Sequence, residues 1–163
     1  MTISTDIFRQ SMALFPGAVT LITTGSGDGR RGITATAVCS VTDTPPSLLV
    51  CVNRKTETCA EITRLGKFSV QLLGGDSDEI AMAFAGARGH KGPEKFGVGD
   101  WEESDHGVPR LQDALVSLCC TVTSHSDAGS HRVFIGRIED STFAEGDALV
   151  YAQSRFHRLQ MAV

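Results

Sequence analysis

The chain has 163 residues, of which 41% are hydrophobic and 21% are charged, and its net charge is −4. This size and composition fit one compact globular domain, residues 1–163, with enough apolar residues for a core. The acidic balance and the lack of a basic run argue against a nucleic-acid partner. No apolar stretch is long enough to span a bilayer, and the N-terminus lacks the pattern of a signal peptide, so we expect a cytoplasmic protein without a membrane partner.

The cysteines predict buried, reduced thiols rather than a metal site. They are odd in number, lie mostly in apolar runs, and show neither a Cys-x-x-Cys pair nor the Cys/His spacing of zinc ligands. We therefore predict no metal-binding residue. The cysteines are Cys39, Cys51, Cys59, Cys119 and Cys120.

The first part of the chain predicts a helix and then a β-hairpin. Ser4 or Thr5 can cap the helix, and Pro16 stops it. The segments 18–24 and 32–41 predict two antiparallel strands joined by a glycine-rich turn. The turn has glycines like those of a dinucleotide-binding fingerprint, but that fingerprint must open a helix and here a strand follows. We exclude a Rossmann site.

The segment 32–41 is the first candidate for a ligand site. With the two-residue period of a strand, one face is apolar and the other carries the hydroxyls of Thr34, Thr36 and Ser40. Small residues let a flat ligand approach the backbone, and the hydroxyls can follow a ribityl chain or a phosphate. The alternative is an ordinary half-buried strand with a solvated Thr/Ser face. The pattern leaves open which face a ligand takes.

The helix that follows the predicted strand 48–52 is a candidate anion site. Thr56 or Thr58 can cap it, Thr58 also begins a capping-box pattern, and Gly66 is placed to end it. A helix N-terminus offers free N–H groups and a partial positive charge. A capped surface helix preceded by solvated cations is the alternative. Because one strand links this helix to Ser40, a phosphate can be held between them. The polar residues before the helix are Asn53, Arg54 and Lys55.

The rest of the chain predicts a mainly β domain with short helices. A helix near Asp76 carries Phe84 on an apolar face, and the segment 86–109 is irregular. In that segment Lys95 can reach a ligand oxygen and Phe96 can cover a ring, or the aromatics simply pin the loop to the surface. Short connections favour a closed or nearly closed antiparallel barrel of about six strands. Further strands are predicted at 68–73, 115–123, 133–143 and 149–152.

Two further segments carry polar side chains near strand ends. His131 stands at the mouth of the strand 133–143, where a lone histidine is usually a solvated residue. Tyr151 and Arg155 lie near the end of the chain and say little by themselves.

Over nearly its whole length the chain resembles the short-chain flavin reductase family, the reductase components of two-component flavin-dependent monooxygenases. This resemblance implies a six-stranded antiparallel split β-barrel with Greek-key topology, the flavin-binding split-barrel type, and a homodimer. The motifs that carry it are, in order, Phe15-Pro-Gly-Ala-Val19, Gly32-Ile-Thr-Ala-Thr-Ala37, Ser40-Val-Thr-Asp-Thr-Pro-Pro46, Phe68-Ser-Val-Gln-Leu-Leu73, Lys95-Phe96, Gly99-Asp-Trp101, His131-Arg-Val-Phe-Ile-Gly136 and Tyr151-Ala-Gln-Ser-Arg155.

The resemblance also implies a set of site residues. His131 would lie at the flavin edge and the nicotinamide, as the candidate catalytic residue. Two departures, Gln71 where Asn is frequent and Thr where Ser is frequent near the phosphate, remove no hydrogen-bonding group. The residues implied beside the ring are Thr34, Ala35, Thr36 and Ala37. Those implied near the phosphates are Ser40, Asn53, Arg54, Lys55, Thr56 and Thr58. The remaining cofactor-binding candidates are Phe84, Lys95, Phe96, Tyr151 and Arg155.

The implied function is the reduction of FAD or FMN by NADH or NADPH, with reduced flavin supplied to a partner monooxygenase. The sequence shows no Ser/His/Asp arrangement and no paired acid and base, and hydride transfer needs none because the cofactors carry the reactivity. A non-catalytic flavin-binding or storage protein is the alternative, and an oxidase or haem-degrading enzyme of the wider split-barrel group is a third. The sequence does not separate FAD from FMN or NADH from NADPH.

Overall fold

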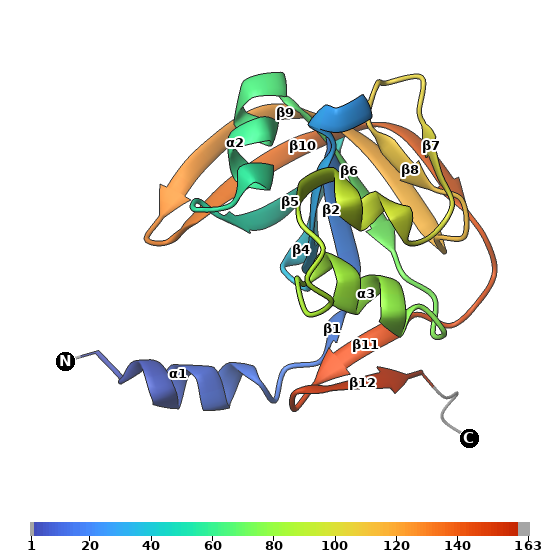
Figure 1. Cartoon of the computed structure of the whole chain (residues 1–163). Coiled ribbons are helices and arrows are strands. Elements are labelled where there is room, and N and C mark those ends of the chain that lie inside the picture. The colour runs from blue at the N-terminus through green and yellow to red at the C-terminus, as the bar shows by residue number, and fades with distance from the viewer. Residues whose placement is uncertain (1, 160–163) are drawn as a thin grey trace.

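The computed structural model describes residues 2–159 and is mainly β with short helices, as predicted (Figure 1). Most strands form one seven-stranded antiparallel sheet in the order β3-β2-β6-β9-β10-β5-β4. Its strands are β2 (Thr20–Thr24), β3 (Arg31–Ala35), β4 (Val38–Asp43), β5 (Pro46–Asn53), β6 (Lys67–Leu72), β9 (Val116–Ala128) and β10 (His131–Phe143).

The predicted strand 32–41 is wrong as a single strand. The strand is interrupted at Thr36 and Ala37, an interruption called the break below. As a result β3 forms one edge of the sheet and β4 forms the other. Because three consecutive Cα–Cα steps cover at most about 11 Å, the two edges come close at this break. The sheet therefore curls strongly, but it has seven strands and is not closed, so the prediction of a barrel with six strands is not borne out in this detail.

Two small sheets complete the β structure of residues 2–159, and both contain strands that the sequence did not predict. β1 (Gly17–Ala18), β11 (Leu149–Ala152) and β12 (Arg155–Arg158) form a three-stranded sheet. β7 (Trp101–Glu103) and β8 (Pro109–Leu111) form a hairpin that begins inside the segment 86–109, which was predicted to be irregular, and ends just after it. Strands of three or four residues are too short to show a two-residue period.

The helices are short, and a side chain caps the first turn of two of them. They are α1 (Thr5–Met12), α2 (Glu57–Leu65) and α3 (Asp78–Phe84), with 3-10 turns η1 (Gly27–Gly29) and η2 (Gly92–Gly97). The Ser4 hydroxyl accepts a hydrogen bond from the Ile7 amide at 3.2 Å. Within residues 2–159, no helix is long and apolar enough to cross a membrane.

The structure decides between Thr56 and Thr58, the two residues predicted as possible N-caps of α2. The Thr56 hydroxyl accepts a hydrogen bond from the Cys59 amide at 3.2 Å, so Thr56 is the N-cap. Thr58 lies inside the helix and is buried, so its capping-box pattern is wrong. The helix ends at Gly66, which has a φ of 68° that favours glycine.

Strand β2 separates two apolar clusters. Leu21 packs with Leu73 and Phe84 under α3, whereas Ile22 packs with Phe68 and residues of α2 inside the curl of the sheet. All five residues of β2 are buried, which requires cover on both faces of the strand. Helix α3 therefore lies against one face of β2 and β3, and this packing brings its residues beside the break at Thr36.

Candidate functional site

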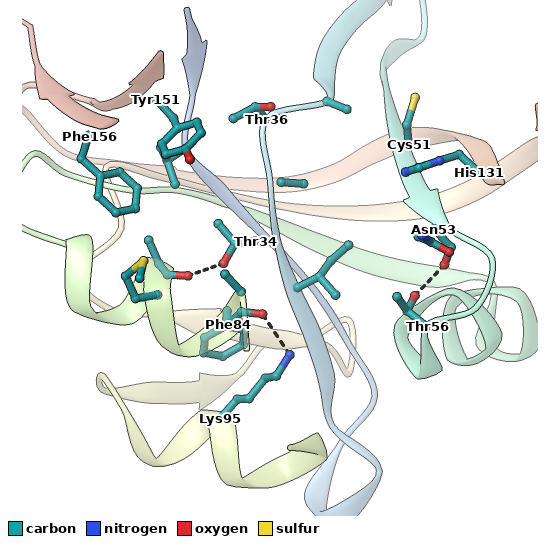
Figure 2. A pocket seen from close by; sticks show the side chains of 17 residues that line it. Thr34, Thr36, Cys51, Asn53, Thr56, Phe84, Lys95, His131, Tyr151 and Phe156 are labelled. Atoms are coloured by element: carbon teal, nitrogen blue, oxygen red, sulfur yellow. Dashed lines mark hydrogen bonds between the residues drawn. The ribbon is translucent and has the colours of Figure 1, made fainter. Parts of the chain in front are cut away.

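A cavity of about 630 Å³, here called the main cavity, lies along β3 and the break that follows it (Figure 2). Helix α3, the end of β5 and the sheet of β11 and β12 supply its other walls. The structure brings many of the predicted site residues to it from segments far apart in the sequence. The predicted residues that line it are Thr34, Ala35, Thr36, Ala37, Asn53, Thr56, Phe84, Lys95, His131 and Tyr151.

Sequence reasoning missed several apolar residues of this cavity. Phe156 lies with its ring 5.4 Å from that of Tyr151, and both rings stand on the same side of the cavity in Figure 2. Ala81 and Met82 come from α3 and Ala85 from its C-cap, and the two alanine side chains leave space. The run of small residues in α3 was the available signal, but it is also typical of a core helix. The other lining residues that were missed are Val19, Ile33 and Cys51.

Strand β3 forms one wall of the main cavity, and hydrogen bonds within the protein hold this wall in place. The Thr34 hydroxyl donates to the Ala81 carbonyl at 2.6 Å, which ties β3 to α3 (Figure 2). The Thr20 hydroxyl donates to the Ala35 carbonyl at 2.6 Å. Thr36 is exposed at the cavity, because the chain leaves the strand there. The hydroxyl of Thr34 therefore fixes the wall, and the break opens it.

Phe84 forms the floor of the main cavity and packs against two other aromatic side chains. Its ring lies 5.0 Å from Phe96 and 5.4 Å from Trp101, centroid to centroid. Phe96 is buried behind it and does not line the cavity, which fits the interpretation that aromatics anchor this segment. A Cβ on Gly32 would lie 2.6 Å from the Phe84 ring, so β3 needs glycine at that point.

Lys95 joins the floor to the wall. Its Nζ donates to the carbonyls of Gly32 at 3.0 Å and of Phe84 at 2.9 Å. Burial lowers the pKa of Lys95, and the negative charge of Glu57 opposes this shift. The ammonium is thus held at the boundary of the main cavity by two backbone groups.

His131 and Asn53 face each other across β10 and β5 at the far side of the cavity. The His131 Nδ1 lies 2.9 Å from the Ser130 hydroxyl, and the ring stands near Cys51 in Figure 2. The Asn53 Oδ1 accepts from the Lys55 amide at 3.0 Å, and its carbonyl accepts from the Thr56 hydroxyl at 2.7 Å. These bonds fix the turn into α2.

A second hollow of about 340 Å³, here called the cationic recess, adjoins the main cavity. The two share Ile33, Thr56 and Lys95 as lining residues. The first amides of α2 have no acceptor inside the helix, and the recess lies at that end. Its lining residues are Arg31, Gly32, Ile33, Thr56, Glu57, Thr58, Gly86, Gly89, His90, Lys91, Gly92 and Lys95.

Apart from Lys95, sequence reasoning also missed the charged residues of the recess. Arg31 follows the glycine-rich turn, and His90 and Lys91 lie in the irregular segment. The basic side chains in this glycine-rich segment were the available signal, but nothing in the sequence placed them near α2.

The remaining predicted residues lie elsewhere. Ser40 is exposed on β4 and lines a different hollow, so the structure does not bring it to the α2 terminus. Arg54 and Lys55 line a groove beside the hairpin of β9 and β10, where Arg54 pairs with Asp127 at 3.3 Å. Thr58 is buried and borders only the recess, and Arg155 is exposed on β12.

Residues 12–160 match the family model for the flavin reductase like domain. This chain belongs to the flavin reductase-like family. The resemblance inferred from the sequence is therefore confirmed.

Two curated flavin reductase-like relatives cover most of the chain. The reductase component of 4-hydroxyphenylacetate 3-monooxygenase from Pseudomonas aeruginosa is 41% identical over 94% of this chain and 91% of its own. The FMN reductase (NADH) RutF from Methylorubrum populi is 39% identical over 98% of this chain and 79% of its own.

A solved flavin reductase-like structure has the same fold. The NADH:FAD oxidoreductase of Streptomyces globisporus, in complex with NAD and FAD fragments, aligns with a TM-score of 0.88 and 26% identity. The alignment covers 98% of this chain and 97% of that one. Relatives of this chain thus carry the names of FMN and FAD reductases that use NADH.

Proposed function

We propose that this protein is an NAD(P)H:flavin oxidoreductase that reduces FAD or FMN by hydride transfer and supplies the reduced flavin to a separate monooxygenase. The observation that supports this most directly is the pair of adjoining hollows, in a chain of the flavin reductase-like family. The main cavity has the size and the largely apolar lining of a small-molecule site. The recess has the cations and the helix terminus that suit a phosphate.

The two hollows divide the flavin between them. The isoalloxazine would lie in the main cavity between the β3 break and Phe84, with Tyr151 and Phe156 beside it. The phosphate would lie in the recess, near Lys95 and the first amides of α2. The residues beside the break, Thr36 and Ala37, are exposed and small enough to let a ring approach the backbone.

The chemistry of hydride transfer from nicotinamide to flavin would be supplied by the two bound cofactors. The protein has to bind and orient them and exclude water. His131 borders the cavity, so we assign it to positioning the nicotinamide or hydrogen-bonding near the flavin edge. Because the Ser130 hydroxyl engages Nδ1, Nε2 is the ring atom left to meet a ligand. No proton donation by His131 is required.

Anaerobic mixing tests the activity. The protein is mixed with FAD or FMN and then with NADH or NADPH, and the absorbance of oxidised flavin is followed. We expect that absorbance to disappear within turnover times. If flavin binds but neither nicotinamide bleaches it, the protein is a flavin-binding or storage module and not a reductase.

The role of His131 is tested by His131→Ala. We expect weaker use of the nicotinamide, seen as a higher KM for NADH, with a smaller change in flavin affinity. His125→Ala is the matched control, because His125 lies on the same hairpin, packs against Phe134 and does not line the cavity. Equal losses of nicotinamide use and flavin binding in His131→Ala would contradict the assigned role.

We also propose a homodimer, which α1 supports. No residue of this helix is buried, and it extends away from the sheet in Figure 1. Its apolar side chains are about half exposed, with Ile7 at 54% and Phe8 at 53%, and Phe15 just beyond it is 67% exposed. An amphipathic helix with an uncovered apolar face is stabilised by packing against another surface. A second copy of the chain, at the matching face, would cover it.

Light scattering after size exclusion tests the dimer. Phe8→Asp should shift the mass from two chains toward one, because a charge cannot be buried unpaired in the interface. Gln10→Asp adds the same charge to another side of α1 and should leave the mass unchanged. A single-chain mass for the unmodified protein would overturn the dimer.

Four further parts complete the proposal. We propose that residues 1–163 act as one flavin reductase-like domain and that the curled sheet is the split barrel of this class. The oxygenase partner is supported by the name of the Pseudomonas aeruginosa relative, which is a monooxygenase reductase component. We place the protein in the cytoplasm, where the free thiols of its five cysteines stay reduced.

A further inference from the structure

Glu57 places a carboxylate in the cationic recess at the start of α2. It is the first residue of α2, next to amides that lack acceptors, and its Oε2 lies 2.6 Å from Nε of Arg31. The same recess is bordered by Lys91 and Lys95. Of the described residues that border it, Glu57 alone carries a carboxylate. The Glu57 carboxylate thus already pairs with the positive charge of Arg31 in the recess.

The Glu57 side chain is exposed to solvent and yet in direct contact with Arg31. Its side chain is 73% exposed, whereas that of Arg31 is 26% exposed. Gly92 stands over the pair, and a Cβ on it would lie 3.7 Å from the Arg31 guanidinium carbon and 3.8 Å from Glu57 Oε2. The charge of Glu57 also acts on Lys95 at the boundary of the main cavity. One carboxylate therefore interacts with two of the cations that border the recess.

We infer that Glu57 is an internal competitor for the flavin phosphate, which weakens phosphate binding in the recess and keeps flavin an exchangeable substrate. This inference rests on the proposed function, because it takes the flavin phosphate as the ligand of the recess. An incoming phosphate must displace the carboxylate from Arg31 or bind beside it against like-charge repulsion. Either route lowers affinity for the phosphorylated flavin and speeds its release.

The competition acts on the phosphate alone, and this gives it a distinctive signature. Riboflavin has the same ring and ribityl chain as FMN but no phosphate, so Glu57 should not oppose it. Removing the Glu57 charge should therefore tighten the binding of FMN and leave the affinity for riboflavin unchanged. The effect should also fade at high ionic strength, because Glu57 is largely exposed to solvent and salt screens such charges.

The test compares Glu57→Gln with the unmodified protein by flavin fluorescence titration. We expect Glu57→Gln to lower the Kd for FMN by about two- to fivefold, the range of an exposed charge pair, with slower FMN release. The Kd for riboflavin should not change. Glu61→Gln is the matched control, because it removes the same charge one turn later on α2, where Glu61 pairs with Arg64.

A second variant keeps the inference testable if the ion pair is needed for folding. Arg31→Gln should weaken FMN binding. When Glu57→Gln is added to the Arg31→Gln variant, the gain in FMN affinity should be smaller than the gain from Glu57→Gln alone. Thermal melting without ligand shows whether each variant is folded. An unchanged FMN Kd in folded Glu57→Gln, or an equal gain for riboflavin, overturns the inference. NADH-dependent bleaching is measured separately, so its absence overturns the proposed function and leaves the binding comparison valid.

Discussion

The main cavity and the cationic recess share a boundary at Lys95 but differ in how their polar groups are used. In the main cavity the hydroxyl of Thr34 and the ammonium of Lys95 are already bonded to backbone carbonyls, so what faces a ligand is mostly apolar surface. In the recess, charged side chains and helix amides face the hollow, and an exposed carboxylate balances them. The first hollow can select a ligand by shape, and the second by charge.

The largest expected effect comes from damage to the main cavity alone, which tests whether this cavity selects by shape and the recess by charge. Phe84→Ala removes a ring that is 1% exposed and packs against Phe96 and Trp101. We expect a loss of about 3–5 kcal/mol in the free energy of unfolding, measured with urea. FMN and riboflavin should weaken equally, because only the ring site is damaged. Phe143→Ala, at an 83% exposed position, is the control and should change stability by less than about 0.5 kcal/mol. A loss confined to FMN would contradict the division of the two hollows.

Thr56→Ala should act mainly on the recess. The variant removes the N-cap hydroxyl that Cys59 donates to, at a cost of about 1 kcal/mol in unfolding free energy. A frayed α2 terminus should weaken FMN more than riboflavin, as titration of both ligands would show. Thr56→Ser keeps the hydroxyl and should restore both properties. If the serine variant behaves like the alanine variant, the capping hydroxyl is not the cause.

The charge of Lys95 predicts a pH dependence that only phosphorylated flavin shows. Burial lowers the pKa of Lys95 from its ordinary value of 10.5. Below the lowered pKa the ammonium favours an anion, and as pH rises through that pKa the charge and its contribution to FMN affinity are lost. We expect FMN affinity to fall at alkaline pH by a few-fold, about the value of one partly exposed charge, with riboflavin unaffected. The same decline in Lys95→Met would assign it to another group.

The smallest expected effect is at Ser40. Because Ser40 is exposed on β4 and borders neither hollow, Ser40→Ala should leave the FMN Kd unchanged. A clear loss of FMN affinity, with unchanged riboflavin affinity, would return Ser40 to the phosphate site that the sequence pattern suggested.

Ser40 and Thr34 show how far a strand pattern can be followed. Both belong to the run of small and hydroxylated residues that the sequence marked as one surface. The structure divides that run at Thr36 and Ala37 and places its halves on opposite edges of the sheet. A two-residue period describes neighbours along one strand, and it carries no information on where a strand ends without a glycine or proline.

Local signals were sufficient for much of the rest. The starts of α1 and α2 to within two residues, the end of α2 at Gly66, and the hairpin of β2 and β3 follow from interactions between residues close in sequence. The ordered motifs were specific enough to identify the flavin reductase-like family. These features depend on propensity, capping and pattern, all of which are encoded locally.

Only the tertiary structure decided what each polar group contacts. Lys95 lies 63 residues from the Gly32 carbonyl that it binds, and Arg31 meets Glu57 from another element. The curl of the sheet, the packing of α3 and the turn into α2 set these distances. The sequence by itself therefore determined the family, most of the elements and many of the residues around the main cavity, because motifs and caps are local. The cationic recess and its carboxylate depend on long-range packing, which the residue pattern does not contain.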